Sequence, residues 1–322
     1  MGVIAGIDEA GFGPVIGPLV VSATAVQLPD DAMDADIWRL LGATVGRKPS
    51  RRAGSLAIGD SKKLYSRQRP NALQHLERGV LASLAAQGAR VGSLRELLRI
   101  VSPAAEGAMA HYPWYAEADL PLPQCISATD VAFAGNALGS AMHKAGVRPA
   151  GIRSEIVFAG EFNRIARATH NKSVLLFGVN SRLLIHLCKD APPGPLRIYA
   201  DRHGGRIHYR APLQQAFAGC GLKVLDETPD WSGYRITGRR RQVELYFGVE
   251  FDRCHLAVAL ASMVSKYLRE LFMMLLNRFW ARRVDNLKPT AGYYTDGKRF
   301  LADIAPAIEA ASLGPDLLRR CR

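Results

Sequence analysis

The chain lacks the cysteine pattern of a disulfide framework or of a structural zinc site. Its 322 residues contain five cysteines, an odd and scattered set, and no two of them form a CxxC pair. Such a set predicts reduced thiols in a cytosolic protein. The five are Cys125, Cys188, Cys220, Cys254 and Cys321.

Long hydrophobic runs are also missing. No segment is long and apolar enough to predict a membrane span, so we expect no membrane association. The N-terminus has no basic region and no cleavage site of the kind that marks a signal peptide. We therefore expect a cytoplasmic protein.

Acidic residues are the scarcer charged type. Against 29 Asp and Glu stand 42 Lys and Arg, which gives a net charge of +13. This excess favours an anionic partner, nucleic acid before membrane, although a merely basic soluble protein is the alternative. Hydrophobic residues make up 48% of the chain, enough to bury a sizeable core in one large or two ordinary domains.

Strand-like and helix-like segments alternate along the chain, which predicts an α/β fold with a mixed sheet. A first strand runs through Ile4 up to Asp8. Further strands are predicted over 19–26, 89–94, 152–159, 196–201, 222–225 and 243–251. Helices are predicted over 34–41, 61–87, 94–101, 129–145, 173–188, 214–218 and 256–280.

The opening strand ends on two adjacent carboxylates. Asp8 and Glu9 close the apolar run, and Gly11 and Gly13 follow in a sharp turn. Carboxylates at the end of a buried strand are costly unless something positive meets them, and a divalent metal ion is one such partner. Glycines beside them allow a close approach of backbone to ligand. The alternative is an ordinary hairpin with a solvated Asp-Glu pair.

Two more acids follow predicted strands. Asp201 ends the strand 196–201, and Asp252 follows the strand 243–251. Acids at strand ends of an α/β sheet commonly converge in one crevice, and all-oxygen ligation selects Mg²⁺ or Mn²⁺. Two such ions can promote phosphodiester hydrolysis. The alternative is three unrelated acidic sites on a basic protein.

Three other segments have a chemical signal. Asp60 and Ser61 are suited to cap a helix, and the two lysines that follow suit a phosphate, although incidental lysines on a surface helix are the alternative. The segment 102–150 holds aromatics that either stack on bases or belong to the core. These are Tyr112, Trp114 and Tyr115. Residues 238–241 form a strongly basic turn.

The chain resembles ribonuclease HII, the type 2 ribonuclease H. Five blocks match in order and cover roughly residues 2–26, 58–100 and 150–302. The resemblance implies a catalytic domain over residues 1–302, in which the segments 27–57 and 102–150 have the character of insertions. Residues 303–322 have the character of a short helical tail. The blocks are Gly6-Ile7-Asp8-Glu9-Ala10-Gly11, Asp60-Ser61-Lys62-Lys63-Leu64, Ile198-Tyr199-Ala200-Asp201, Asp252 with Ala261-Ser262 and Lys266, and Gly292-Tyr293-Tyr294-Thr295.

The resemblance implies an RNase H-like fold, with a central mixed sheet flanked by helices, and a metal-dependent endoribonuclease. It implies hydrolysis of the RNA strand of RNA–DNA hybrids, or of ribonucleotides embedded in DNA, with 5′-phosphate and 3′-hydroxyl ends. We expect a monomer with a two-metal site of Mg²⁺ or Mn²⁺. The implied catalytic and metal-binding acids are Asp8, Glu9, Asp201 and Asp252.

The resemblance also implies a set of substrate contacts. The turn Gly11-Phe12-Gly13 would bind the substrate, with the amides of Gly11 and Gly13 meeting a ribose 2′-hydroxyl, the group that separates RNA from DNA. Tyr293 would stack on the neighbouring deoxyribose at an RNA–DNA junction. Phosphate contacts would come from Ser61, Lys62 and Lys266.

This sequence departs from the family at one position of the opening turn. Phe12 stands where an arginine is usual between Gly11 and Gly13, and Arg202 or the basic loop around 47–52 could replace the missing charge. A substrate-clamping C-terminal extension is not evident. Two alternatives follow: a nuclease of altered specificity that cuts only longer hybrids, or an inactive nucleic-acid-binding relative.

Overall fold

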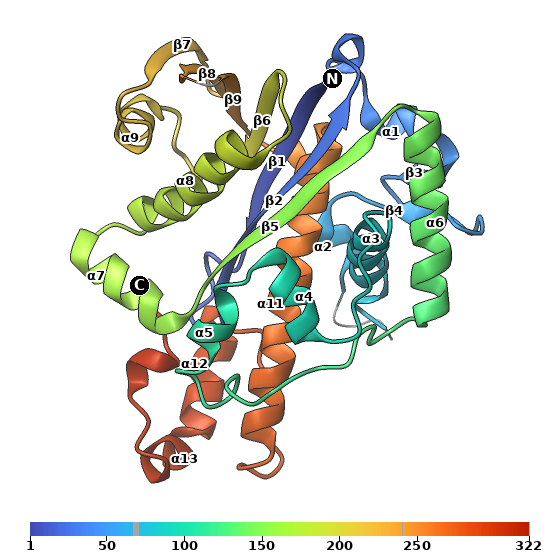
Figure 1. Cartoon of the computed structure of the whole chain (residues 1–322). Helices are drawn as coiled ribbons and strands as arrows, with labels where there is room; N and C mark the ends of the chain where they lie inside the picture. The colour runs from blue at the N-terminus through green and yellow to red at the C-terminus, as the bar shows by residue number, and fades with distance from the viewer. Residues whose placement is uncertain (67–70, 240, 322) are drawn as a thin grey trace.

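One seven-stranded mixed sheet organises the computed structural model, which describes residues 1–66, 71–239 and 241–321. The strand order is β5-β2-β1-β6-β9-β8-β7, with β6 parallel to both β1 and β9 and all other neighbours antiparallel (Figure 1). The predicted α/β fold with a central mixed sheet is confirmed. Its strands are β1 (Gly2–Ala10), β2 (Leu19–Leu28), β5 (Arg148–Val157), β6 (Leu196–Asp201), β7 (Gly221–Glu227), β8 (Trp231–Thr237) and β9 (Gln242–Gly248).

Helices cover both faces of the sheet, so β1 is buried on both sides. Successive side chains of a strand point to opposite faces. Ile4 accordingly joins the core under α11 (Leu256–Ala281), whereas Val3 and Ala5 join the core under α8 (Lys172–Asp190). Figure 1 shows α8 and α11 on the two sides of β1. This double cover explains why β1 is apolar without alternation up to its acids.

The helices otherwise follow the sequence prediction closely. Predicted helices over 94–101, 129–145, 173–188 and 256–280 correspond to α4, α6, α8 and α11. In the described part of the chain, no helix combines the length and apolar character needed to cross a membrane. The remaining bounds are α1 (Ile37–Leu40), α2 (Ser61–Leu64), α3 (Gln74–Ala85), α4 (Leu94–Val101), α5 (Ala105–Met109), α6 (Ala128–Lys144), α7 (Ala159–Thr169), α9 (Arg210–Ala216), α10 (Phe251–Cys254), α12 (Tyr294–Asp303) and α13 (Ala305–Ala310), with two short strands, β3 (Val45–Gly46) and β4 (Leu56–Ala57), paired in parallel.

The predicted strand over 89–94 is wrong. Ser93 instead caps α4, and its Oγ accepts a hydrogen bond from the amide of Glu96 at 3.3 Å. Of the apolar residues in this short run, only Leu94 belongs to the helix, and Ala89 and Val91 lie in the irregular connection before it. A run of this length cannot be identified as a strand by its pattern alone.

The strand β8 is absent from the sequence prediction because Gly233 interrupts its pattern. In the structure Gly233 pairs with Tyr246 of β9. A Cβ atom at Gly233 would lie 2.7 Å from the ring of Trp231 and 3.1 Å from that of Tyr246, so two aromatic rings occupy the space that a side chain would need.

The predicted helix over 61–87 is two helices in the structure. Tyr65 ends α2 in an extended conformation, and α3 begins only at Gln74. Residues 67–70 of this prediction, Arg240 of the predicted basic turn and Arg322 of the C-terminal tail lie outside the described residues.

The segment 102–150 packs into the same core as α11. α6 lies along α3, and the predicted aromatic group is buried, with exposed fractions of 5% for Tyr112 and 2% each for Trp114 and Tyr115. The core alternative for these aromatics is therefore confirmed, and a base-stacking role for them is wrong.

The end of the chain folds back onto the opening loop. The amide of Arg320 donates to the carbonyl of Val15 at 2.9 Å, and its buried guanidinium donates to the carbonyl of Pro14. The C-terminal tail thereby holds the loop that follows Asp8 and Glu9 in place.

Candidate active site

A pocket of about 330 Å³ brings together most of the predicted site residues. All four predicted acids line it: Asp8, Glu9, Asp201 and Asp252. So do five of the predicted substrate-binding residues: Gly11, Ser61, Lys62, Lys266 and Tyr293. Residues that lie up to 285 positions apart in the sequence thus meet in one place, as the resemblance implies.

The register of the sheet places Asp8 next to Asp201. β1 and β6 are parallel, and Ile7 pairs with Ala200, so the next residue on each strand is an aspartate. Helix α11 fixes this end of β1, because the hydroxyl of Ser265 donates to the backbone carbonyl of Asp8 at 2.9 Å. The amide of Glu9 donates to Oδ1 of Asp8 at 2.7 Å, which orients the first carboxylate.

Asp252 reaches the pocket from a helical turn. The prediction that it ends a strand is wrong, since β9 ends at Gly248 and Asp252 lies in α10. Glu250 adopts a left-handed conformation with φ 55° between the two elements, and this reverses the chain. The turn brings Asp252 back over the end of β6.

Burial and mutual repulsion raise the pKa values of the first two acids. Burial raises the pKa of Asp8 well above its usual value, and the charges of Glu9 and Asp201 raise it further. Burial and then Asp201 raise the pKa of Glu9 to about 8. The end of β1 therefore stores electrostatic strain that a cation would relieve.

The pKa values of the other two acids, Asp201 and Asp252, are also raised by burial and by a neighbouring carboxylate. Burial and then the charge of Asp252 raise the pKa of Asp201 to about 6. Burial and then Asp60 raise the pKa of Asp252. Perturbed carboxyl groups in a common pocket are typical of functional sites.

The donor set suits a hard divalent cation. Only carboxylate oxygens are offered by the four acids, and Oδ1 of Asp201 is buried without a hydrogen-bond partner among the described residues. As the side chains in the described ranges lie, no three His, Cys, Asp or Glu residues form a group that could hold a metal ion. Binding would therefore require the carboxylates to turn toward one another, which a cation would favour.

Cationic groups stand on the α2 side of the pocket. Asp60 caps α2, accepting a hydrogen bond from the amide of Lys62 at 3.0 Å. The charge of Lys62 lowers the pKa of Glu9 and of Asp201 against the effect of burial, so its ammonium group lies near the acids. Ser61 is anchored to α11 through a hydrogen bond of 2.9 Å between its hydroxyl and that of Ser262.

Lys266 lines the pocket but is engaged inside the protein. Its ammonium group lies 2.6 Å from Oε1 of Glu270 and 4.4 Å from the centre of the Tyr65 ring. A phosphate contact by Lys266 stays a prediction, and such a contact would be shared with Glu270.

The three residues of the opening turn lie in different environments. Gly11 lines the pocket with φ +89°, a conformation that favours glycine. Phe12 packs against the core under α8, and Gly13 is exposed with nothing within 4 Å of a Cβ built there. Neither of these two lines the pocket, and their substrate contacts stay predictions. Arg202 does not line it either, because its guanidinium donates to the carbonyl of Pro229.

Tyr293 lies at the rim of the pocket with 56% of its surface exposed. It precedes α12 as the N-cap residue, and its carbonyl accepts the amide of Gly297. The ring is therefore free to meet a ligand over the acids while its backbone is fixed.

Seven residues that line the pocket are not predicted as site residues from the sequence, and four of them are charged: Asp60, Glu250, Arg253 and Arg269. Arg253 is paired with Glu250. Asp60 has only a capping role in the sequence pattern, yet it adds a fifth carboxylate. Glu250 reaches the pocket because the chain reverses just before α10, and no sequence motif predicts that reversal. Arg269 is buried at 1% exposure, and its Nη2 donates to the carbonyls of Ile16 at 3.2 Å and Ala291 at 3.1 Å. A charge within an apolar helix stripe is the signal that could have found it.

Comparison with known proteins finds similarity to solved structures alone. No protein-family model and no curated protein matches the chain. The RNase HII of Archaeoglobus fulgidus, solved in complex with PCNA, is 16% identical with a TM-score of 0.45, over 99% of this chain and 94% of that one. The ribonuclease H2 of Pyrococcus horikoshii OT3 is 15% identical with a TM-score of 0.45, over 98% and 92%.

A third similar structure is Bst-RNase HIII in complex with Mn²⁺, at 16% identity and a TM-score of 0.43, over 99% of this chain and 66% of that one. The first two are named RNase HII and ribonuclease H2, and the third is named RNase HIII. At these identities and TM-scores the case for function depends on this chain's own residues.

Proposed function

We propose that the chain is a divalent-metal-dependent endoribonuclease that hydrolyses the RNA strand of RNA–DNA hybrids, or ribonucleotides embedded in DNA. The observation that carries this proposal is the convergence of Asp8, Glu9, Asp201 and Asp252 in one pocket. Burial, and then repulsion from a neighbouring carboxylate, raises the pKa of each of them, in a protein whose net charge is +13. An acidic centre on a basic protein suits metal-assisted cleavage of a bound polyanion.

The four acids would hold Mg²⁺ or Mn²⁺ in a two-metal site. When bound, the ions would supply a nucleophilic water and charge stabilisation for the leaving oxygen. The products would be 5′-phosphate and 3′-hydroxyl ends. Ser265 holds the end of β1 and Ser262 holds Ser61 of α2 against α11, and the carboxylates would have to turn toward one another to bind the ions.

The residues around the acids would hold the substrate. Lys62 would contact a phosphate, because its ammonium group is close to the acids without an ion pair to any described carboxylate. The backbone of Gly11 would approach a ribose 2′-hydroxyl, and the exposed ring of Tyr293 would stack on the adjoining sugar.

A second candidate differs in substrate choice. Phe12 has no guanidinium and that of Arg202 bonds to Pro229, so the charge usual in the opening turn is not replaced by Arg202. The two arginines that line the pocket are engaged elsewhere, Arg253 with Glu250 and Arg269 with the carbonyls of Ile16 and Ala291. A nuclease without that charge would bind a single embedded ribonucleotide less firmly than a continuous hybrid, which has many backbone contacts.

The test compares two labelled duplexes, one with a single ribonucleotide in DNA and one with a continuous RNA–DNA hybrid, each with Mg²⁺ and with Mn²⁺. Cleavage of both with 3′-hydroxyl products supports the first candidate. Cleavage of the continuous hybrid alone supports the second. Failure to cut either duplex counts against both.

A further inference from the structure

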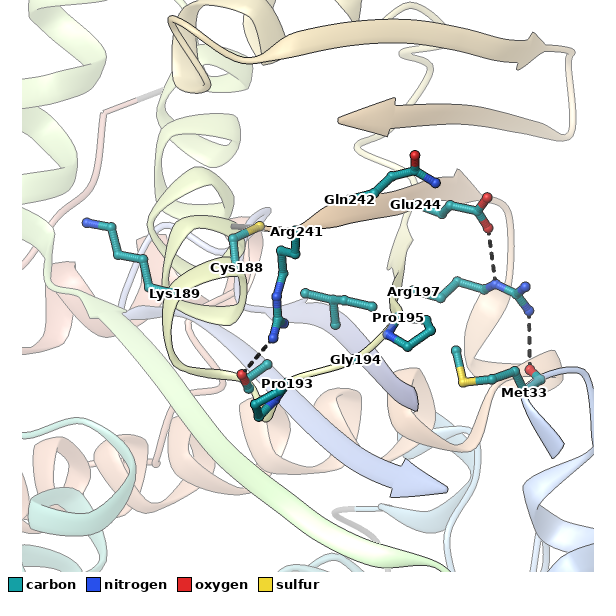
Figure 2. Close-up of a pocket in the computed structure, with 12 residues that line it drawn as sticks. Met33, Cys188, Lys189, Pro193, Gly194, Pro195, Arg197, Arg241, Gln242 and Glu244 are labelled. Carbon is teal, nitrogen blue, oxygen red and sulfur yellow. Dashed lines mark hydrogen bonds and ion pairs between the residues drawn. The ribbon is translucent and has the colours of Figure 1, made fainter. Parts of the chain in front are cut away.

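A second large pocket lies at the end of the sheet opposite to the acids. It measures about 870 Å³ and is lined by the starts of β6 and β9 and by the loop between α8 and β6 (Figure 2). Asp201 is at the other end of β6, and a strand rises ~3.3 Å per residue, so about 17 Å separate the pocket from the acid centre. A ligand here would not overlap a substrate at the acids.

Lys189 and Arg241 line this pocket, and in the described ranges no carboxylate lies within 4.0 Å of their charged groups. The third cation of the lining, Arg197, is paired with Asp34 at 2.6 Å and with Glu244 at 3.4 Å. Arg241 donates through Nη2 to the carbonyls of Ala191 and Pro192 at 3.0 and 2.6 Å, while its buried Nη1 has no partner among the described residues. Figure 2 shows its guanidinium directed at the loop of Pro193. Arg241 thus lines the pocket as a guanidinium fixed on two carbonyls, with one donor that no described group accepts.

The carboxylates nearby are already engaged. Glu244 lies 3.4 Å from Arg197 and 2.9 Å from Arg235. Asp190 lies 2.8 Å from His186. Burial raises the pKa of the Cys188 thiol to about 11, so it adds no negative charge. The pocket therefore presents net positive charge to a ligand.

An apolar hollow of about 520 Å³ adjoins this pocket and shares Cys188, Lys189 and Arg241 with it. Its walls include Phe217, Ile236 and Val243. The two together form a groove with an apolar half and a cationic half. A phosphate attached to a flat apolar ring system matches that division, because guanidinium groups bind phosphate oxygens and aromatic side chains stack on bases.

We propose that this groove binds a nucleoside monophosphate, with the phosphate on Lys189 and Arg241 and the base in the hollow beside Phe217. The site is independent of hydrolysis at the acids. Inorganic phosphate would fill only the cationic half, and a nucleoside only the apolar half.

The proposal is tested by isothermal titration calorimetry of the whole chain with dAMP, inorganic phosphate and deoxyadenosine. Wild type should bind dAMP at least tenfold more tightly than it binds either inorganic phosphate or deoxyadenosine. Lys189→Ala should weaken dAMP about tenfold through loss of a charge-assisted contact. Phe217→Ala should weaken dAMP but leave phosphate unchanged. Lys189 is exposed, so its variant should fold normally, and Lys144→Ala on α6 is the matched control.

Three results would overturn the proposal. The first is no measurable binding of dAMP, or phosphate binding as tight as dAMP binding. The second is equal dAMP affinity in wild type and Lys189→Ala. The third is loss of dAMP binding in Lys62→Ala, which would place the probe at the acid centre.

Discussion

The backbone of Gly11 lies directly against the side chain of Arg269. A Cβ atom added to Gly11 would overlap Nε and Cδ of this buried arginine, and it would also approach the carbonyl of Pro18 at 2.6 Å. Arg269 in turn donates to the carbonyls of Ile16 and Ala291. One guanidinium thus joins the opening turn to the segment that carries Tyr293.

Gly11→Ala should therefore destabilise the fold and reduce cleavage together. Alanine is strained at φ +89°, and the overlap forces Arg269 to move, for a combined loss of roughly 2–4 kcal/mol. Urea unfolding and hybrid cleavage measure the two effects. Gly13→Ala is the matched control, since no atom lies within 4 Å of its Cβ position, and it should change stability by less than ~1 kcal/mol. Equal stability of the two variants would contradict the role given to Arg269.

Glu270 should make stability depend on pH. Burial raises its pKa, but the Lys266 ammonium group and the Tyr65 hydroxyl outweigh burial and hold the pKa below the ordinary 4.5. A depressed folded-state pKa gives stability that is present above the unfolded pKa and is lost as pH falls through the folded value.

Glu270→Gln should accordingly lose roughly 2–4 kcal/mol at pH 7, because it leaves buried cations without their partner. The difference from wild type should begin to shrink below about pH 4.5, where the unfolded wild-type carboxylate takes up a proton, and should vanish as pH falls through the lower folded pKa. Unfolding free energies at several pH values between 7 and 3.5 measure this. A difference that is constant with pH would show that the ion pair does not contribute.

Added Mg²⁺ should stabilise the protein through the acid centre. An ion that binds only the folded state raises its stability by about 2.7 kcal/mol at a concentration of 100 Kd. Asp8→Asn removes one ligand and one buried charge, so its melting temperature should rise in EDTA and respond little to Mg²⁺. Glu309→Gln, which removes an exposed carboxylate on α13, should behave as wild type in differential scanning calorimetry. An equal Mg²⁺ response in all three proteins would place the ion elsewhere.

Tyr293→Ala should reduce cleavage at a single embedded ribonucleotide about tenfold or more, because stacking of a ring is worth ~1–3 kcal/mol. Stability should hardly change, since the ring is 56% exposed. Phe133→Ala is the control, because this ring is similarly exposed at 53% but lies on α6, outside the acid pocket. Equal activity of both variants on this substrate would remove Tyr293 from the site.

The acid centre could be predicted largely from the sequence, because strand ends in an α/β sheet share an edge. Asp8, Glu9 and Asp201 end buried strands, and parallel pairing of β1 with β6 makes their proximity a matter of register. Asp252 was placed on the wrong element, since the chain reversal at Glu250 depends on a left-handed residue that no local pattern marks.

Contacts between distant segments were beyond the sequence pattern. The sequence does not predict β8, because Gly233 interrupts its strand pattern. The space for a side chain at Gly233 is occupied in part by the ring of Tyr246 on β9, and this contact is not visible in the local sequence. The packing of Phe12 into the core under α8 depends on tertiary structure in the same way. The groove of Lys189 and Arg241 also forms only when α8 and β9 meet.

The central claim is that the four carboxylates are the catalytic centre of an endoribonuclease. The most direct measurement is cleavage of an end-labelled RNA–DNA hybrid with Mg²⁺ or Mn²⁺ by wild type, Asp201→Asn and Glu309→Gln. Removing one essential ligand should lower the rate by at least ~10². We predict cleavage by wild type and Glu309→Gln, none without metal, and at least a hundredfold loss in Asp201→Asn. Undiminished cleavage by Asp201→Asn, or cleavage by wild type in EDTA, would contradict the account.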